Sequence, residues 1–138
     1  MKRTVYPLLA FFFLFIYGCE KQTGKPDLNQ LLPGEWEFIK AVGGLTGNQV
    51  ILPPAGTKTT LIFSPDHKYK KNNNGQTFEQ GSYDLIMVTS IFTGQPDDAI
   101  RFNDFSSQNE QLISIENDSL WITDNHVEPF GYLYIKLK

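Results

Sequence analysis

The sequence is poor in the residues that build disulfides, metal centres and several kinds of catalytic site. Cys19 is the one cysteine, which excludes an internal disulfide bond. The two histidines, His67 and His126, lie in segments with turn signals, and neither has a second histidine or cysteine at zinc-site spacing. The chain also lacks the Gly-x-Ser-x-Gly elbow of hydrolases. We therefore expect no catalytic residues, no metal and no cofactor, and a protein that is not an enzyme.

A surplus of basic residues is missing too. The 138 residues carry a net charge of −3, and the net charge becomes −5 if Lys2 and Arg3 leave with an N-terminal signal. Such a surface would repel the phosphates of a nucleic acid. We expect no nucleic-acid partner and a monomer, and the length predicts one domain.

The longest apolar run is too short for a membrane-spanning helix. It covers residues 5–16, directly after Lys2 and Arg3, whereas a spanning helix needs about 20 apolar residues. A short basic stretch followed by a compact apolar segment is typical of a secretory signal.

The end of this run, Ile16-Tyr17-Gly18-Cys19, resembles the lipobox of bacterial lipoproteins. The resemblance implies cleavage between Gly18 and Cys19, which removes residues 1–18 as a signal peptide. It also implies a diacylglyceryl thioether on Cys19 and acyl chains such as palmitate, and two or more chains hold a protein firmly on a membrane. Glu20 is not the aspartate that retains some lipoproteins at the inner membrane. The resemblance therefore favours the outer membrane of the cell envelope and leaves the leaflet open.

Residues 19–29 are polar and without periodicity, which predicts a flexible tether. The folded domain is expected over residues 30–138, and Asp27–Leu32 could form one helical turn before it. From Gly34 onward the apolar residues alternate with polar ones, as in half-buried strands. Eight strands are expected, at residues 34–40, 59–64, 68–71, 77–88, 99–105, 112–116, 119–124 and 132–138. Short turns between them predict an all-β fold, an antiparallel up-and-down barrel.

Several segments resemble small bacterial lipocalin-like lipoproteins. They are Gly34-x-Trp36, the stretch Leu61–Tyr69, Gly81-Ser82-Tyr83 and the stretch Ser119–Asp124. His67 departs from the glycine that the group has in its first hairpin. The resemblance implies a barrel that binds a small apolar molecule or a partner protein.

Five aromatic residues are expected to point into the barrel, as core or as ligand contacts: Trp36, Phe38, Phe63, Tyr83 and Phe102. An eight-stranded barrel is just wide enough to be filled or to hold one small ligand, and the large side chains favour filling. Trp121, Tyr132 and Tyr134 alternate away from this set. They are expected either to form an exposed partner-binding face or to pack beneath a loop. The leading hypothesis is a membrane-anchored module that binds a small apolar ligand, a glycan or an envelope protein. The alternative is a structural, protein-interaction or inhibitor lipoprotein that acts through the barrel exterior.

Overall fold

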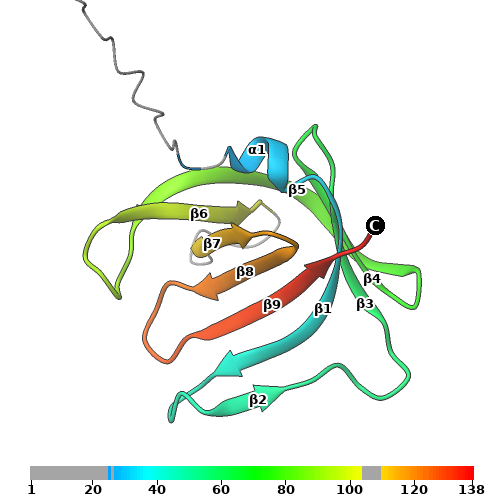
Figure 1. The fold of residues 1–138 in the computed structure, drawn as a ribbon, viewed down its shortest axis with the longest axis horizontal. Helices are drawn as coiled ribbons and strands as arrows, with labels where there is room; N and C mark the ends of the chain where they lie inside the picture. The colour runs from blue at the N-terminus through cyan, green and yellow to red at the C-terminus, as the bar shows by residue number, and fades with distance from the viewer. Residues whose placement is uncertain (1–24, 26, 104–109) are drawn as a thin grey trace, which may run out of the picture.

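The computed structural model describes residues 25, 27–103 and 110–138. Within these residues one short helix precedes nine strands, and eight of the strands close into a barrel (Figure 1). The elements are α1 (Leu28–Leu31), β1 (Gly34–Gly43), β2 (Gln49–Ile51), β3 (Thr59–Phe63), β4 (Lys68–Asn73), β5 (Gln76–Thr89), β6 (Pro96–Phe102), β7 (Glu110–Glu116), β8 (Ser119–Asp124) and β9 (Phe130–Lys136). The predicted signal segment and Cys19 lie outside the described residues.

The barrel strands are all antiparallel, and each pairs with the next along the chain. β1 is followed in the sheet by β3, and β9 pairs back onto β1 from Trp36 opposite Lys136 to Gly43 opposite Phe130. This closure confirms the predicted up-and-down barrel.

The short strand β2 was not predicted. It pairs with Ala41–Gly43, the last residues of β1. β3 pairs with the same edge of β1 nearer to its start, at Gly34–Glu37. All three residues of β2 are exposed. Because no face of β2 is buried, its sequence carries no alternation from which a strand could be predicted.

The residue types in the turns determine where the chain folds back into hairpins. Asn74 and Gly75 connect β4 to β5 with φ values of 48° and 80°, the left-handed pair that an Asn-Gly turn adopts. The β4–β5 pairing has one register shift, beside Phe78, between the pairs Lys71–Glu79 and Asn72–Thr77, whereas Gly81 pairs regularly with Tyr69.

Helix α1 closes one end of the barrel, here named the closed end. Asp27 caps the helix by accepting a hydrogen bond from Asn29 N at 3.0 Å. Leu32 follows the helix and is fully buried, and Trp36 Nε1 donates to its carbonyl oxygen at 2.8 Å. The helical turn expected over Asp27–Leu32 is therefore present as α1, with Asp27 as its N-cap and Leu32 as its C-cap.

The buried core lies between this helix and the middle of the barrel. Its members are apolar or aromatic and come from the residue after α1 and from every barrel strand except β9: Leu32, Trp36, Leu61, Phe63, Tyr69, Tyr83, Ile100, Phe102, Ile113, Leu120 and Ile122. Among the described residues no helix has the length and apolar character needed to cross a membrane.

Candidate functional site

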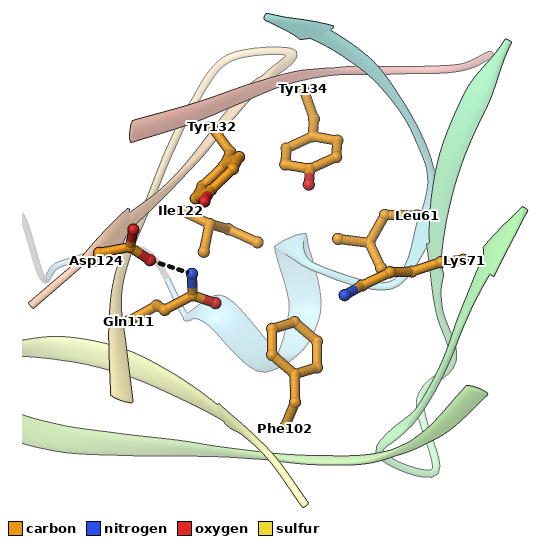
Figure 2. A pocket seen from close by; sticks show the side chains of 8 residues that line it. All are labelled: Leu61, Lys71, Phe102, Gln111, Ile122, Asp124, Tyr132 and Tyr134. Carbon is orange, nitrogen blue, oxygen red and sulfur yellow. Dashed lines mark hydrogen bonds between the residues drawn. The ribbon is translucent and has the colours of Figure 1, made fainter. Parts of the chain in front are cut away.

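A cavity of about 340 Å³ lies inside the barrel (Figure 2). Its lining comes from six strands: Leu61, Lys71, Phe102, Gln111, Ile122, Asp124, Tyr132 and Tyr134. Asp124 ends β8 and Tyr132 lies near the start of β9. The opposite end of β9 contacts the helix, because Lys136 Nζ donates to Leu31 O at 2.7 Å. The cavity therefore lies toward the end of the barrel away from α1, here named the mouth.

Tyr132 and Tyr134 face inward, which corrects the expectation that they share an exposed face with Trp121. Tyr132 pairs with Ile122 and Tyr134 with Leu120, and both β8 partners are buried in the core. Directly opposed residues of an antiparallel pair share one face of the sheet. Trp121 pairs with Leu133 on the outward face, so the three aromatic residues do not form one surface.

The interpretation of β9 failed because both of its faces carry large side chains. Leu133 and Ile135 alternate with the two tyrosines, and every residue of β9 is half-buried. Hydropathy placed the aliphatic residues inside, whereas the register with β8 places the tyrosines there.

An ion pair lies on one wall of the cavity. Lys71 pairs with Leu61, which directs its side chain inward, and Lys71 Nζ lies 2.8 Å from Glu79 Oε1. The same carboxylate oxygen accepts a hydrogen bond from Tyr69 Oη at 2.9 Å. Lys71 Nζ also lies 5.3 Å from the ring centroid of Phe102, within cation–π range. These contacts fix the ammonium group beside an aromatic face.

A held carboxylate lies on the opposite wall (Figure 2). Gln111 Nε2 donates to Asp124 Oδ1 at 2.7 Å, and Phe130 N donates to Asp124 Oδ2 at 3.2 Å. The side chain of Asp124 is 15% exposed, and His126 Nε2 lies 3.6 Å from Asp124 Oδ2. By formal charge, Lys71, Glu79 and Asp124 together contribute −1 to this region.

The hydroxyls of Tyr132 and Tyr134 point into the cavity (Figure 2). Within the described part of the chain no hydrogen bond reaches either hydroxyl. Burial raises the pKa of Tyr134 far above its usual value, and Tyr132 and Glu79 add to this effect. Burial, followed by the charge of Asp124, also raises the pKa of Tyr132. Both groups therefore stay protonated at neutral pH and can donate to a bound molecule.

The five aromatic residues expected inside the barrel have different positions. Trp36, Phe63 and Tyr83 lie in the buried core, and Phe102 belongs both to the core and to the cavity wall. Phe38 is half-buried, and its ring centroid lies 5.5 Å from that of Tyr134. Whether any of them contacts a ligand stays a prediction.

The polar members of the lining were not predicted from the sequence. Lys71 lies two residues after the buried Tyr69, and Asp124 lies two residues after the buried Ile122. Gln111 lies two residues before Ile113 in the same way. A strand that keeps its period of two past its last apolar residue places the next polar residue inside the barrel. This continuation of the alternation past the last apolar residue is the sequence signal that would have predicted the polar lining residues.

The two histidines have separate surroundings. His67 lies in the turn between β3 and β4 at a φ of 60°, with its ring stacked on that of Tyr83 at 5.1 Å. Over residues 25, 27–103 and 110–138 no group of three or more His, Cys, Asp or Glu side chains is placed to hold a metal ion. Compared with known proteins, the chain matches no family model, no curated protein and no solved structure.

Proposed function

We propose that the protein is a non-enzymatic, lipid-anchored lipoprotein of the cell envelope whose barrel binds one small polyhydroxylated molecule, such as a sugar unit of a glycan. One observation carries the proposal. Two protonated tyrosine hydroxyls, which no hydrogen bond from the described residues reaches, face a cavity that also holds a fixed carboxylate and a fixed amide.

The size of the cavity suits a small ligand. Its volume of about 340 Å³ lies at the lower end of the range of small-molecule sites, which is roughly 300–1,000 Å³. The closed end is filled by the core, so a ligand has to occupy the space near the mouth. A molecule of one or two sugar rings is a reasonable upper size.

The lining favours a polar ligand over a purely apolar one. An apolar molecule would separate Asp124, Gln111 and the two tyrosine hydroxyls from water without replacing their hydrogen bonds. Each buried polar group left in that state costs about 1–3 kcal/mol. The net charge of −1 at the cavity also disfavours a carboxylate or phosphate ligand. A neutral molecule rich in hydroxyl groups meets both conditions.

The aromatic walls fit the same ligand. The rings of Tyr132, Tyr134 and Phe102 surround the cavity (Figure 2) and can cover the C–H faces of a sugar. Asp124 and Gln111 can accept from its hydroxyls. The alternative, action on a partner through the barrel exterior, has lost support because two of its three aromatic residues lie inside.

The lipid anchor rests on residues 1–19 of the sequence alone. Labelling of cells with a fatty-acid analogue tests it, and the protein should carry the label while the Cys19→Ala variant should not. An unlabelled wild-type protein would remove the anchor from the proposal.

Binding is tested on the mature chain with Cys19→Ser, which keeps it unacylated. Native mass spectrometry and calorimetry would compare neutral mono- and disaccharides with fatty acids of similar mass. Asp124→Asn and Tyr134→Phe should each weaken sugar binding by about tenfold, the cost of one hydrogen bond to a buried ligand. Tyr83→Phe is a matched control, because its hydroxyl donates to Ser64 O at 3.2 Å outside the cavity. Binding of fatty acids in preference to every sugar would contradict the proposed ligand class.

A further inference from the structure

We propose that three neighbouring turns of the barrel form an apolar surface that contacts the lipid bilayer to which the protein is anchored. This surface, here named the apolar rim, consists of four exposed side chains, Leu45, Ile91, Phe92 and Val127. The inference rests on the lipid anchor of the proposed function. It follows from the chemistry of these turns and from the place where the chain from Cys19 reaches the barrel.

Hydrogen bonds hold the three turns side by side. Asn125 of the β8–β9 turn accepts from Ile91 N through Oδ1 at 2.9 Å and donates to Thr89 O through Nδ2 at 3.0 Å, which joins it to the β5–β6 turn. Pro129 O of the same turn accepts from Gly44 N of the β1–β2 turn at 3.1 Å. Figure 1 shows the three turns on one side of the molecule. The apolar rim therefore occupies one region of the surface.

The turns of the rim carry large apolar side chains and little charge. Leu45 and Val127 are each 81% exposed, and the other two side chains of the rim are about half exposed. The β1–β2 and β5–β6 turns hold no charged residue, and the β8–β9 turn adds only Glu128 and His126. Exposed apolar side chains that gather in one region mark a contact with a membrane or with another protein.

The chain enters the described fold beside the apolar rim. Lys25 Nζ lies 2.7 Å from Asp98 Oδ2 and 3.3 Å from Asp97 Oδ1, near the start of β6. Pro96, the residue before Asp97, pairs with Thr89 at the end of β5. Because Thr89 is also bonded to the β8–β9 turn, the incoming chain is attached next to the turns that carry the rim.

Little chain separates this attachment from the acylated cysteine. Six residue steps lead from Cys19 to Lys25, and nine lead to Leu28 of α1. At about 3.3–3.6 Å per residue these segments span at most roughly 20 Å and roughly 30 Å, respectively. Leu28 packs against the core and shares a shallow pocket with Met87 of β5, so the reach stays short even when the Lys25 ion pair opens. The anchor therefore keeps the rim close to lipid, at a high effective concentration.

A bilayer suits this surface better than a second copy of the chain. The rim consists of side chains on separate turns, and each of them can enter a fluid lipid layer, whereas two folded copies would need complementary shapes. Lipid also lies within reach of every anchored molecule. The acidic residues beside the rim, Asp97, Asp98 and Glu128, provide no attraction to anionic headgroups. Burial of the apolar side chains therefore has to drive the contact.

The experiment uses the acylated full-length protein in vesicles of phosphatidylcholine. Because lipid occupies Cys19, one added cysteine gives a unique site for a fluorophore that brightens in apolar surroundings. Phe92→Cys places the label on the rim, and Phe78→Cys places it on the β4–β5 hairpin, away from the three turns in Figure 1. The two phenylalanines are matched, since they are 52% and 56% exposed.

Each label is compared with the same label on the unacylated Cys19→Ser chain in buffer. Anchoring in vesicles should raise the emission of the Phe92→Cys label about threefold or more, because the rim leaves water. The emission of the Phe78→Cys label should change by less than about 1.5-fold, because the β4–β5 hairpin stays in water. Equal increases at the two positions overturn the proposed contact.

Charged substitutions on the other two turns test the cause. Leu45→Asp combined with Val127→Asp should reduce the increase of the Phe92→Cys label by about half or more, because a carboxylate resists entry into lipid. Both parent side chains are largely exposed, so the fold should be kept, which circular dichroism checks. Phe78→Asp is the control and should leave the increase unchanged. An increase that survives the double substitution overturns the role of the rim.

Two further measurements separate the contact from the anchor and from self-association. If the Phe92→Cys label on the unacylated chain brightens in buffer as the protein concentration rises, a second copy covers the rim, and the bilayer contact is overturned. Protein that does not float with vesicles overturns the anchor itself, whereas floating protein with equal label responses overturns the rim contact alone. Sugar binding is measured on the unacylated chain, so it stands or falls independently of both.

Discussion

The closed end and the mouth of this barrel are built by the same strands with different chemistry. At the closed end, Leu32 and Trp36 are completely buried and Trp36 bonds to the backbone after the helix. Toward the mouth, the inward positions of the same strands pass from apolar to polar residues. On β4 the inward residue after Tyr69 is Lys71, and on β8 the inward residue after Ile122 is Asp124.

Two strands show how polar residues come to line a cavity without a change of backbone geometry. From Tyr69 to Lys71 on β4, and from Ile122 to Asp124 on β8, the period of two continues and only the side chains change. Polar side chains at the mouth are fixed by hydrogen bonds to one another, as Gln111 is to Asp124, so they do not collapse into the space between the walls. Stability is therefore expected to concentrate at the closed end and ligand recognition at the mouth.

The largest expected effect is a difference between the two ends in how much a truncated side chain lowers the free energy of unfolding. Trp36→Ala should lower the free energy of unfolding by about 3–5 kcal/mol, because it opens a cavity in a filled core. Tyr134→Ala should cost less than half of that, since its ring borders space that is already empty. Urea denaturation of both variants provides the measurement. Equal losses would mean that the mouth is packed as tightly as the closed end.

A smaller effect is expected where the backbone of the mouth is most crowded. A Cβ atom on Gly43 would lie 2.0 Å from Pro129 O and 2.8 Å from Phe130 Cα, so the β1–β9 pairing would have to shift. Gly43→Ala should therefore destabilise the protein by about 1–3 kcal/mol. Gly131→Ala is the matched control on β9, because its Cβ would meet only ordinary contacts at 3.4 Å and beyond. Thermal unfolding of Gly43→Ala and Gly131→Ala provides the measurement. Similar melting temperatures for the two variants would contradict the expectation that the backbone at Gly43 cannot move aside.

The sequence predicted the fold better than the site, for reasons visible in single residues. The barrel followed from alternation such as that of Trp36 and Phe38 with Glu35 and Glu37, because each strand had one apolar face. β9 had large side chains on both faces, so only its pairing with β8 decided that Tyr132 points inward. Lys71 and Asp124 were missed because a charged residue on a strand is ordinarily assigned to the solvent face.

The smallest expected effect tests how well the mouth shields its tyrosines. Burial raises the pKa of Tyr134 above that of an unfolded tyrosine, about 10. The buried hydroxyl stays protonated while the unfolded one ionises, so the stabilisation is complete below pH 10 and is lost progressively as pH rises above it. Between pH 9 and pH 11 the wild type should lose about 1 kcal/mol more than Tyr134→Phe, measured by urea denaturation at each pH. If Tyr134→Phe lost as much stability between pH 9 and pH 11 as the wild type, the Tyr134 hydroxyl would have to be exposed to water. The cavity would then be a shallow depression of the surface and not a binding site within the barrel.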